Sequence, residues 1–61
     1  MGFEPDDIIK IKETGKVGVV KYNFQWSTRY WVWFPGIGEA EVDESQMELI
    51  TNNKNDNETN E

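Results

Sequence analysis

Glu39 and Glu41 are the residues of this chain whose types and spacing come closest to a catalytic pair. In an extended strand their side chains fall on one face, about 7 Å apart. Paired carboxylates at such a spacing can serve as the acid and base of glycoside hydrolysis. The chain has 61 residues, however, and we expect no substrate cleft around the pair. We therefore interpret the two carboxylates as a charged strand face that prevents edge pairing.

Other kinds of reactive centre are excluded by composition. The sequence has no Cys and no His, which removes disulfides, thiol nucleophiles, the usual zinc sites and the imidazole base. It also has no Asp-x-Asp-x-Asp-Gly calcium loop. The sequence predicts neither an enzyme nor a resident metal or cofactor.

Aromatic residues offer a binding chemistry instead. Phe24 and Trp26 flank a polar segment, and together with Tyr22 or Tyr30 they could form an aromatic pocket for a methylated cation. The alternative is that Phe24 closes one end of a small barrel. A pocket requires several rings to converge, which a sequence does not reveal.

Basic residues offer a third chemistry, the binding of a phosphate backbone with Trp or Phe stacked on the bases. Within residues 1–50 all the bases precede residue 30: Lys10, Lys12, Lys16, Lys21 and Arg29. The net charge of −6 has the wrong sign for nucleic acid. The alternative is that these are ordinary solvated strand positions.

The elements that must position these residues are strands. Turn signals recur about every eight to twelve residues, as in a small barrel or sandwich, and no segment has a helical period. Gly18 suggests a bulge, a bend or a close backbone approach. We expect strands at residues 7–12, 16–24, 29–34, 39–43 and 47–50, with a short 3₁₀ turn at 44–46.

Alternation along strand 29–34 gives the strongest functional lead. If Tyr30, Val32 and Phe34 fill the core, Trp31 and Trp33 point outwards; the opposite assignment buries both Trp side chains.

On strand 16–24 the sequence places Gly18, Val20 and Tyr22 opposite Val17 and Val19. We expect Val17 and Val19 to share the outer face with Trp31 and Trp33 and to form a partner-binding surface. Alternatively, curled barrel ends or the tail cover the two indoles.

The two ends of the chain complete the organisation. Residues 51–61 have no apolar side chain, so we expect a folded domain over 1–50 followed by a disordered polar tail. No apolar run approaches the roughly 18 residues of a membrane span, and the first residues lack the features of a signal peptide. We expect a cytoplasmic chain without a membrane partner.

The order of these segments resembles the SH3-like barrels of the Tudor and KOW type. Residues 5–11 (PDDIIKI) resemble the opening P-G-D-x-V-x-V of those families, and residues 15–20 (GKVGVV) resemble their G-x-x-G-x-V core. Residues 30–34 (YWVWF) are similar to their third strand, and residues 42–49 (VDESQMEL) to their closing segment. The resemblance covers residues 5–50, although Asp6 stands where the families usually have Gly.

The resemblance implies a five-stranded SH3-like barrel that binds without catalysis. Similar domains bind RNA or the ribosome, as KOW domains do, or dock on RNA polymerase, as Tudor-like domains of bacterial helicases and CarD-type regulators do. We therefore expect a protein-interaction module that docks on a larger machine, in transcription or nucleic-acid processing. The alternatives are RNA or DNA binding through the basic first hairpin and the aromatic loop, and a homodimeric accessory protein. The length and composition are also typical of phage-type proteins.

Overall fold

The computed structural model describes residues 2–52 as five β-strands and one short 3₁₀ helix. The elements are β1 (Asp7–Ile11), β2 (Val17–Asn23), β3 (Arg29–Phe34), β4 (Gly38–Asp43), η1 (Glu44–Gln46) and β5 (Met47–Asn52). This confirms the predicted all-β fold with a 3₁₀ turn before the last strand.

The last strand is longer than the sequence predicts. β5 continues past residue 50 because Thr51 pairs with Ile8 and Asn52 pairs with Asp7. The predicted boundary of the domain at residue 50 therefore falls inside a strand. The rest of the predicted tail, residues 53–61, lies outside the described residues.

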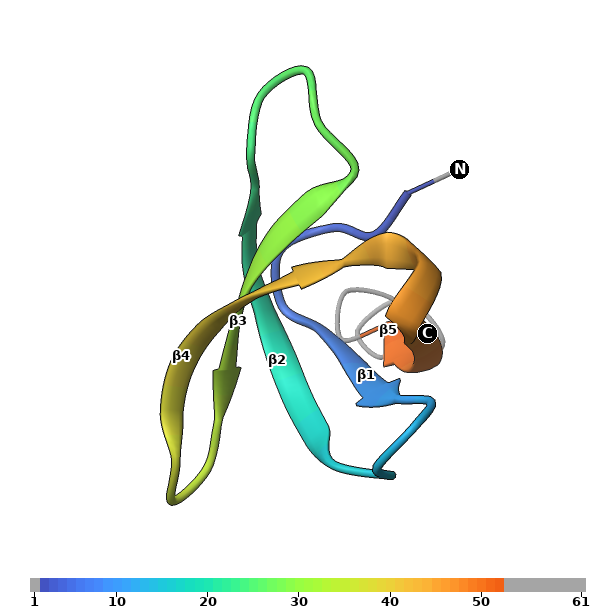
Figure 1. Ribbon diagram of the computed structural model, residues 1–61, viewed down its shortest axis with the longest axis vertical. Helices are drawn as coiled ribbons and strands as arrows, with labels where there is room; N and C mark the ends of the chain where they lie inside the picture. Colours follow the sequence, from blue (N-terminus) through green and yellow to red (C-terminus); the bar gives the residue numbers. More distant parts are fainter. Residues whose placement is uncertain (1, 53–61) are drawn as a thin grey trace, which may run out of the picture.

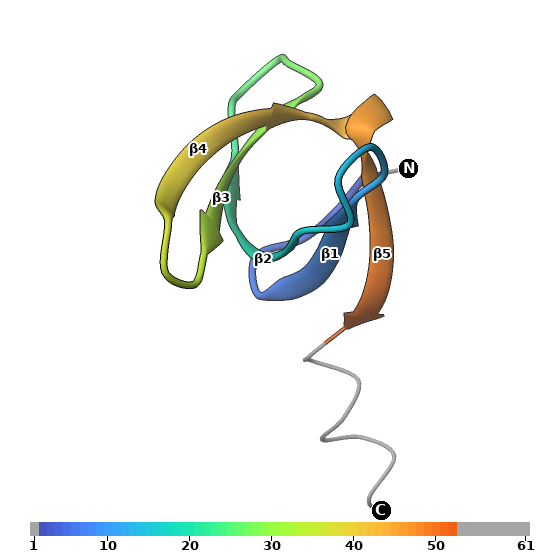
Figure 2. The same ribbon diagram turned by 60° about the horizontal axis from the view of Figure 1, so that its bottom comes forward.

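All neighbouring strands are antiparallel, in the order β4-β3-β2-β1-β5. The first four strands follow one another along the sheet, and β5 returns to the far side of β1. The sheet curls strongly, so that its two edge strands, β4 and β5, turn toward each other and η1 joins them (Figures 1 and 2). A small, curled, five-stranded antiparallel sheet of this kind is compatible with an SH3-like barrel.

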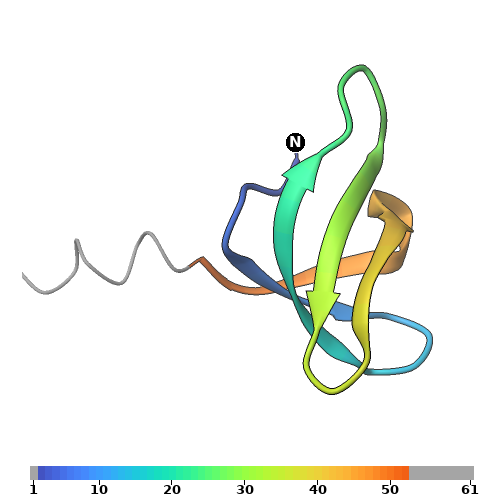
Figure 3. The ribbon, with the colours of Figure 1, turned by 90° about the vertical axis from the view of Figure 1, so that its left-hand side faces the viewer.

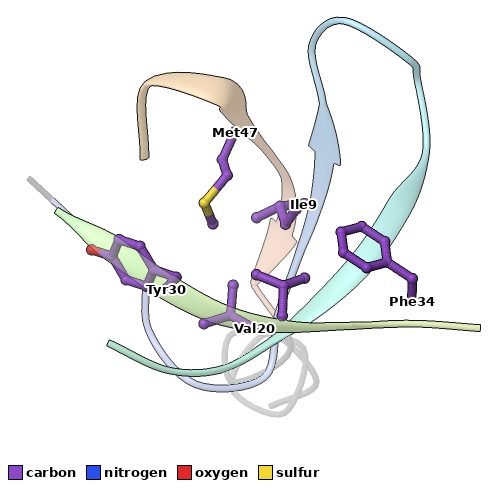
Figure 4. Close-up of a cluster of buried hydrophobic side chains, with 6 residues drawn as sticks. Ile9, Val20, Tyr30, Phe34 and Met47 are labelled. Atoms are coloured by element: carbon purple, nitrogen blue, oxygen red, sulfur yellow. The ribbon is translucent and has the colours of Figure 1, made fainter. Parts of the chain in front are cut away.

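The core lies inside the curl (Figure 4). Ile9, Val20 and Val32 are fully buried, and burying an aliphatic side chain of this size contributes about 1.5–3 kcal/mol. The complete buried set is Ile9, Val20, Tyr30, Val32, Phe34 and Met47. Partly buried Phe3, Ile11 and Val42 pack against it.

Strand β3 therefore adopts the first of the two assignments that alternation allows. Tyr30, Val32 and Phe34 point into the core, and Trp31 and Trp33 lie on the opposite face. The core needs these three side chains because β4 contributes only the partly buried Val42 to it.

Gly18 lies at a close approach between strands, which is one of the three possibilities that the sequence leaves open for it. A Cβ atom at this position would lie 2.8 Å from the Phe34 ring and 2.8 Å from Cγ1 of Val32. No ordinary contact is that short, so the core side chains of β3 occupy the space that a larger residue would need.

The bulge of β2 lies further along, at Lys21. Val20 pairs with Val32, but the next pair joins Tyr22 to Trp31, which leaves Lys21 as the extra residue. An extra residue shifts the alternation of faces by one. Tyr22 is thereby moved to the outer face, so the sequence-based placement of Tyr22 beside Val20 is wrong.

A type II turn opens the fold. The Asp7 amide donates to the Glu4 carbonyl (3.0 Å), Pro5 follows Glu4, and Asp6 has φ 77°. Position three of such a turn requires a positive φ, which Gly adopts freely and Asp tolerates better than most residues. Asp6 thus takes the conformation expected of the Gly that usually stands there.

Candidate protein-docking surface

One side of the sheet carries an apolar surface over β2 and β3, which lie side by side in Figure 3. Across the two strands Trp33 pairs with Val19 and Trp31 pairs with Tyr22. We call Val17, Val19, Tyr22, Trp31 and Trp33 the outer aromatic face. Exposed fractions are 46% for Val17, 46% for Tyr22 and 40% for Trp33, whereas Val19 and Trp31 are half-buried.

The sequence-based grouping of Val17, Val19, Trp31 and Trp33 on one face thus agrees with the strand register. Trp33 is the more accessible indole. The half-buried Trp31 ring contacts Tyr22 and Phe24.

Those neighbours form a cluster of three rings. The Tyr22 ring centroid lies 5.2 Å from that of Phe24, with the planes at 75°, and 6.3 Å from the Trp31 centroid, with the planes at 24°. Phe24 and Trp31 are 6.3 Å apart, edge to face. The rings contact one another, and residues 2–52 enclose no pocket.

The four residues predicted for an aromatic pocket are therefore separated. Tyr22 and Phe24 meet on the outer face, with Trp31 as their third ring. Tyr30 is in the core, 4% exposed, because alternation puts it opposite Trp31; its hydroxyl accepts a hydrogen bond from the Phe3 amide (3.0 Å). Trp26 stands alone in the β2–β3 loop, 93% exposed.

Carboxylates border the outer aromatic face along β4. Glu39 pairs with Trp33 and Glu41 with Trp31, so both acids share the face of the indoles. Nε1 of Trp31 donates to Oε1 of Glu39 at 2.9 Å, and Nη1 of Arg29 lies 3.3 Å from Oε2 of Glu41. The sequence analysis did not predict the Trp31–Glu39 contact. Glu39 is the diagonal neighbour of Trp31 on β4, and diagonal neighbours can be identified only when the register of the two strands is known.

Asp43 joins the β2–β3 loop to η1. Its carboxylate accepts hydrogen bonds from the hydroxyl of Thr28 (2.7 Å), the hydroxyl of Ser45 (2.7 Å) and the backbone amide of Ser45 (3.0 Å). These bonds, led by that of Thr28 and helped by the charge of Arg29, lower the pKa of Asp43 from 3.8 to about 2. Asp43 therefore stays ionised at any pH near neutrality.

The basic residues divide into two groups. Lys10 lies 4.0 Å from Glu48 on β5, and Arg29 forms the ion pair with Glu41. The other three are exposed: Lys12 and Lys16 beside the β1–β2 turn, and Lys21 in the bulge of β2. Two of the five predicted phosphate ligands thus already face a carboxylate.

The described residues hold neither a cluster of metal-binding side chains nor a helix suited to cross a membrane. Residues 2–52 contain no group of three or more acidic, His or Cys side chains that could hold a metal ion. No helix among them is long and apolar enough to cross a membrane.

Comparison with protein-family models, with curated proteins and with solved structures finds no match to this chain. Function is therefore inferred from the side chains that the fold presents to solvent.

Proposed function

We propose that this chain is a non-catalytic protein-interaction module that docks through the outer aromatic face. The observation that carries the proposal is a contiguous apolar surface on one side of a very small sheet, with Trp33 at 40% and Val17 at 46% exposure. Contiguous apolar surface of this kind is uncommon unless a partner covers it. Trp is also among the residues most enriched at the energetic centres of protein interfaces.

The border of the face indicates the kind of partner. Glu39 and Glu41 flank the indoles, and Arg29 faces Glu41. On the β1 side the border holds Lys10, which pairs with Val17 and lies 4.0 Å from Glu48, so carboxylates outnumber cations around the face. A basic protein surface complements this border and is attracted to it over a distance. A second copy of the chain carries the same carboxylates and lacks that complementarity. We therefore favour a different protein over a homodimer.

The resemblance of residues 5–50 to Tudor- and KOW-type barrels extends the proposal. Tudor-like domains of bacterial helicases and CarD-type regulators dock on RNA polymerase. By that resemblance, the partner proposed for this chain is part of a larger machine of transcription or nucleic-acid processing.

A matched pair of variants tests the docking face. Trp33→Ala removes the most exposed indole of the face, and Ile37→Ser removes an apolar side chain that is 66% exposed in the β3–β4 turn. Wild type and both variants are immobilised and incubated with a cell lysate, and the bound proteins are quantified by mass spectrometry. We expect proteins that wild type and Ile37→Ser retain and Trp33→Ala loses. Identical capture by all three folded chains overturns the proposal.

Nucleic-acid binding is the second candidate, supported by one observation: exposed Lys21, in the bulge of β2, precedes the loop that carries the exposed indole of Trp26. Exposed Lys12 and Lys16 lie at the other end of β2, beside the β1–β2 turn. Such a combination can follow phosphates and stack on bases. It predicts that binding of single-stranded oligonucleotides weakens steeply with salt. An anisotropy titration without binding at low salt removes this candidate.

A further inference from the structure

Trp26 is the most exposed large apolar residue of the described chain. It belongs to the loop between β2 and β3, which projects well beyond the sheet at the top of Figure 1. Its side chain is 93% exposed, and the ring contacts of Phe24 are made with Tyr22 and Trp31 instead. Trp26 therefore contributes almost nothing to the packing of the fold.

The backbone of Trp26 has an unusual conformation. Its φ is 59°, in the left-handed region, which bulky residues seldom adopt. Such outliers are kept where surrounding structure holds them, and they concentrate at functional sites. Trp26 makes almost no packing contacts and has an unfavourable backbone conformation, so a role in binding another molecule is the better explanation for a Trp at this position.

Hydrogen bonds hold the loop in this shape. Nδ2 of Asn23 donates to the carbonyls of Ser27 (3.3 Å) and Arg29 (2.9 Å). The Arg29 amide donates to Oγ of Ser27 at 3.0 Å, and the Phe24 amide donates to the Arg29 carbonyl at 3.0 Å. The indole is thus presented from a pre-organised loop, which lowers the entropy lost when it binds.

The charges around the loop select the partner. Residues 22–28 carry no charge, and the bases Lys21 and Arg29 flank them. Three carboxylates, those of Glu41, Asp43 and Glu44, lie at the base of the loop and outnumber these two cations. The Glu44 amide donates to the Thr28 carbonyl (2.8 Å), and the Thr28 hydroxyl donates to Asp43. Glu41 lies beside them, paired with Arg29.

We propose that Trp26 is an anchor that inserts into an apolar pocket with a basic rim on a partner protein. The proposal rests on the proposed function for the existence of a protein partner, and it adds the chemistry of the contact. Phe24 connects the loop to the outer aromatic face, because it follows β2 and packs on Tyr22. One partner can therefore cover both the face and the anchor.

Other occupants fit less well. In a second copy, residues 2–52 offer no pocket as a receptor for the indole. Nucleic acid and anionic membranes both present phosphates. Lys21 attracts them, but Arg29 is already paired with Glu41, and the carboxylates of Asp43 and Glu44 repel them. A basic protein surface is attracted by the same carboxylates.

The test compares Trp26→Ser, Trp26→Phe and Trp33→Ser with the control Ile37→Ser, all as full chains. Proteins captured by wild type and Ile37→Ser are identified and purified, and each is titrated by anisotropy. We expect Trp26→Ser to bind at least about tenfold more weakly, Trp26→Phe to be intermediate, and the wild-type affinity to fall as salt rises. The indole N–H signal of Trp26 in a ¹⁵N-labelled chain, assigned by its loss in Trp26→Phe, shifts on binding.

The outcomes separate this proposal from the proposed function. If Trp33→Ser loses the partner and Trp26→Ser does not, the docking face stands and the anchor is wrong. If only Trp26→Ser loses it, the anchor stands and the face is wrong. An unshifted Trp26 signal in the complex also overturns the anchor. So does a Trp26-dependent shift with oligothymidine, or with phosphatidylcholine–phosphatidylglycerol vesicles, in place of protein.

Discussion

The indole Nε1 of Trp31 donates a 2.9 Å hydrogen bond to Oε1 of Glu39 on the neighbouring strand. The bond fixes the orientation of a ring that also stacks on Tyr22. One carboxylate of the acidic border is thereby tied to the aromatic surface, and the other, Glu41, is tied to Arg29.

Removal of the Glu39 acceptor tests this link. Glu39→Ala leaves the Trp31 indole N–H to water, and we expect its proton signal to move upfield and to exchange faster. Because the bond is exposed, stability changes by only about 0.5–1 kcal/mol. Glu39→Gln keeps an acceptor and shows a smaller change. Glu41→Ala is the control, and an equal response of the Trp31 signal to Glu41→Ala contradicts the assignment.

The hydrogen bonds of Asp43 predict a dependence of stability on acid. Its pKa is lower in the folded protein, about 2 against 3.8, so the folded state favours the ionised carboxylate. The stability it contributes is complete above about pH 4 and is lost as pH falls through about 2. We expect Asp43→Asn to be less stable than wild type at pH 7 and to lose less stability between pH 4 and 2.

Urea unfolding at pH 7, 4 and 2.5 measures this effect. Glu48→Gln serves as the control, because Glu48 makes a single long ion pair at 4.0 Å on another strand. Parallel stability profiles of Asp43→Asn and wild type below pH 4 would show that Asp43 is not the group responsible.

The close approach at Gly18 predicts a cost for any added side chain. Gly18→Ala puts a Cβ 2.8 Å from Phe34 and Val32, and overpacking of this kind lowers the free energy of unfolding by about 1–3 kcal/mol. Phe34→Leu removes the ring that obstructs the Cβ. In denaturant unfolding, we expect the double variant to lose less than the sum of the single losses. Strict additivity means that the two positions do not meet.

The left-handed backbone of Trp26 predicts that the loop can be stabilised. Asn accepts a positive φ better than an aromatic residue, and the exposed indole takes no packing with it. We expect Trp26→Asn to raise the free energy of unfolding by about 0.5–1 kcal/mol. Trp26→Val, β-branched in the same conformation, lowers it. Thermal unfolding gives the order of stability of wild type, Trp26→Asn and Trp26→Val. A Trp26→Val chain more stable than Trp26→Asn contradicts the left-handed conformation of residue 26.

Strand β3 illustrates what the sequence predicts well. Alternation alone separates Tyr30, Val32 and Phe34 from Trp31 and Trp33, because a strand has only two faces. The choice between the faces needed the structure. The sequence likewise identifies Gly18 as a special position, but it does not distinguish a bulge or a bend from a close approach between strands.

Features that depend on which residues pair between strands could not be predicted from the sequence. Tyr22 changes face because Lys21 is an extra residue in β2, and nothing in the residue types marks the bulge. Thr51 and Asn52 belong to a strand only because β1 offers them partners. Trp26 was grouped with other aromatics by sequence proximity, whereas its exposure follows from the left-handed loop that carries it.

The pairing of β5 with β1 brings the last described strand against the first. Met47, at the start of β5, also supplies part of the core, so a growing polypeptide lacks this contribution until β5 has been synthesised. The chain must lose the entropy of bringing such distant segments together before their contacts stabilise the fold, and this slows folding. We therefore expect refolding in milliseconds to seconds, in one cooperative step that no fragment ending before β5 reproduces.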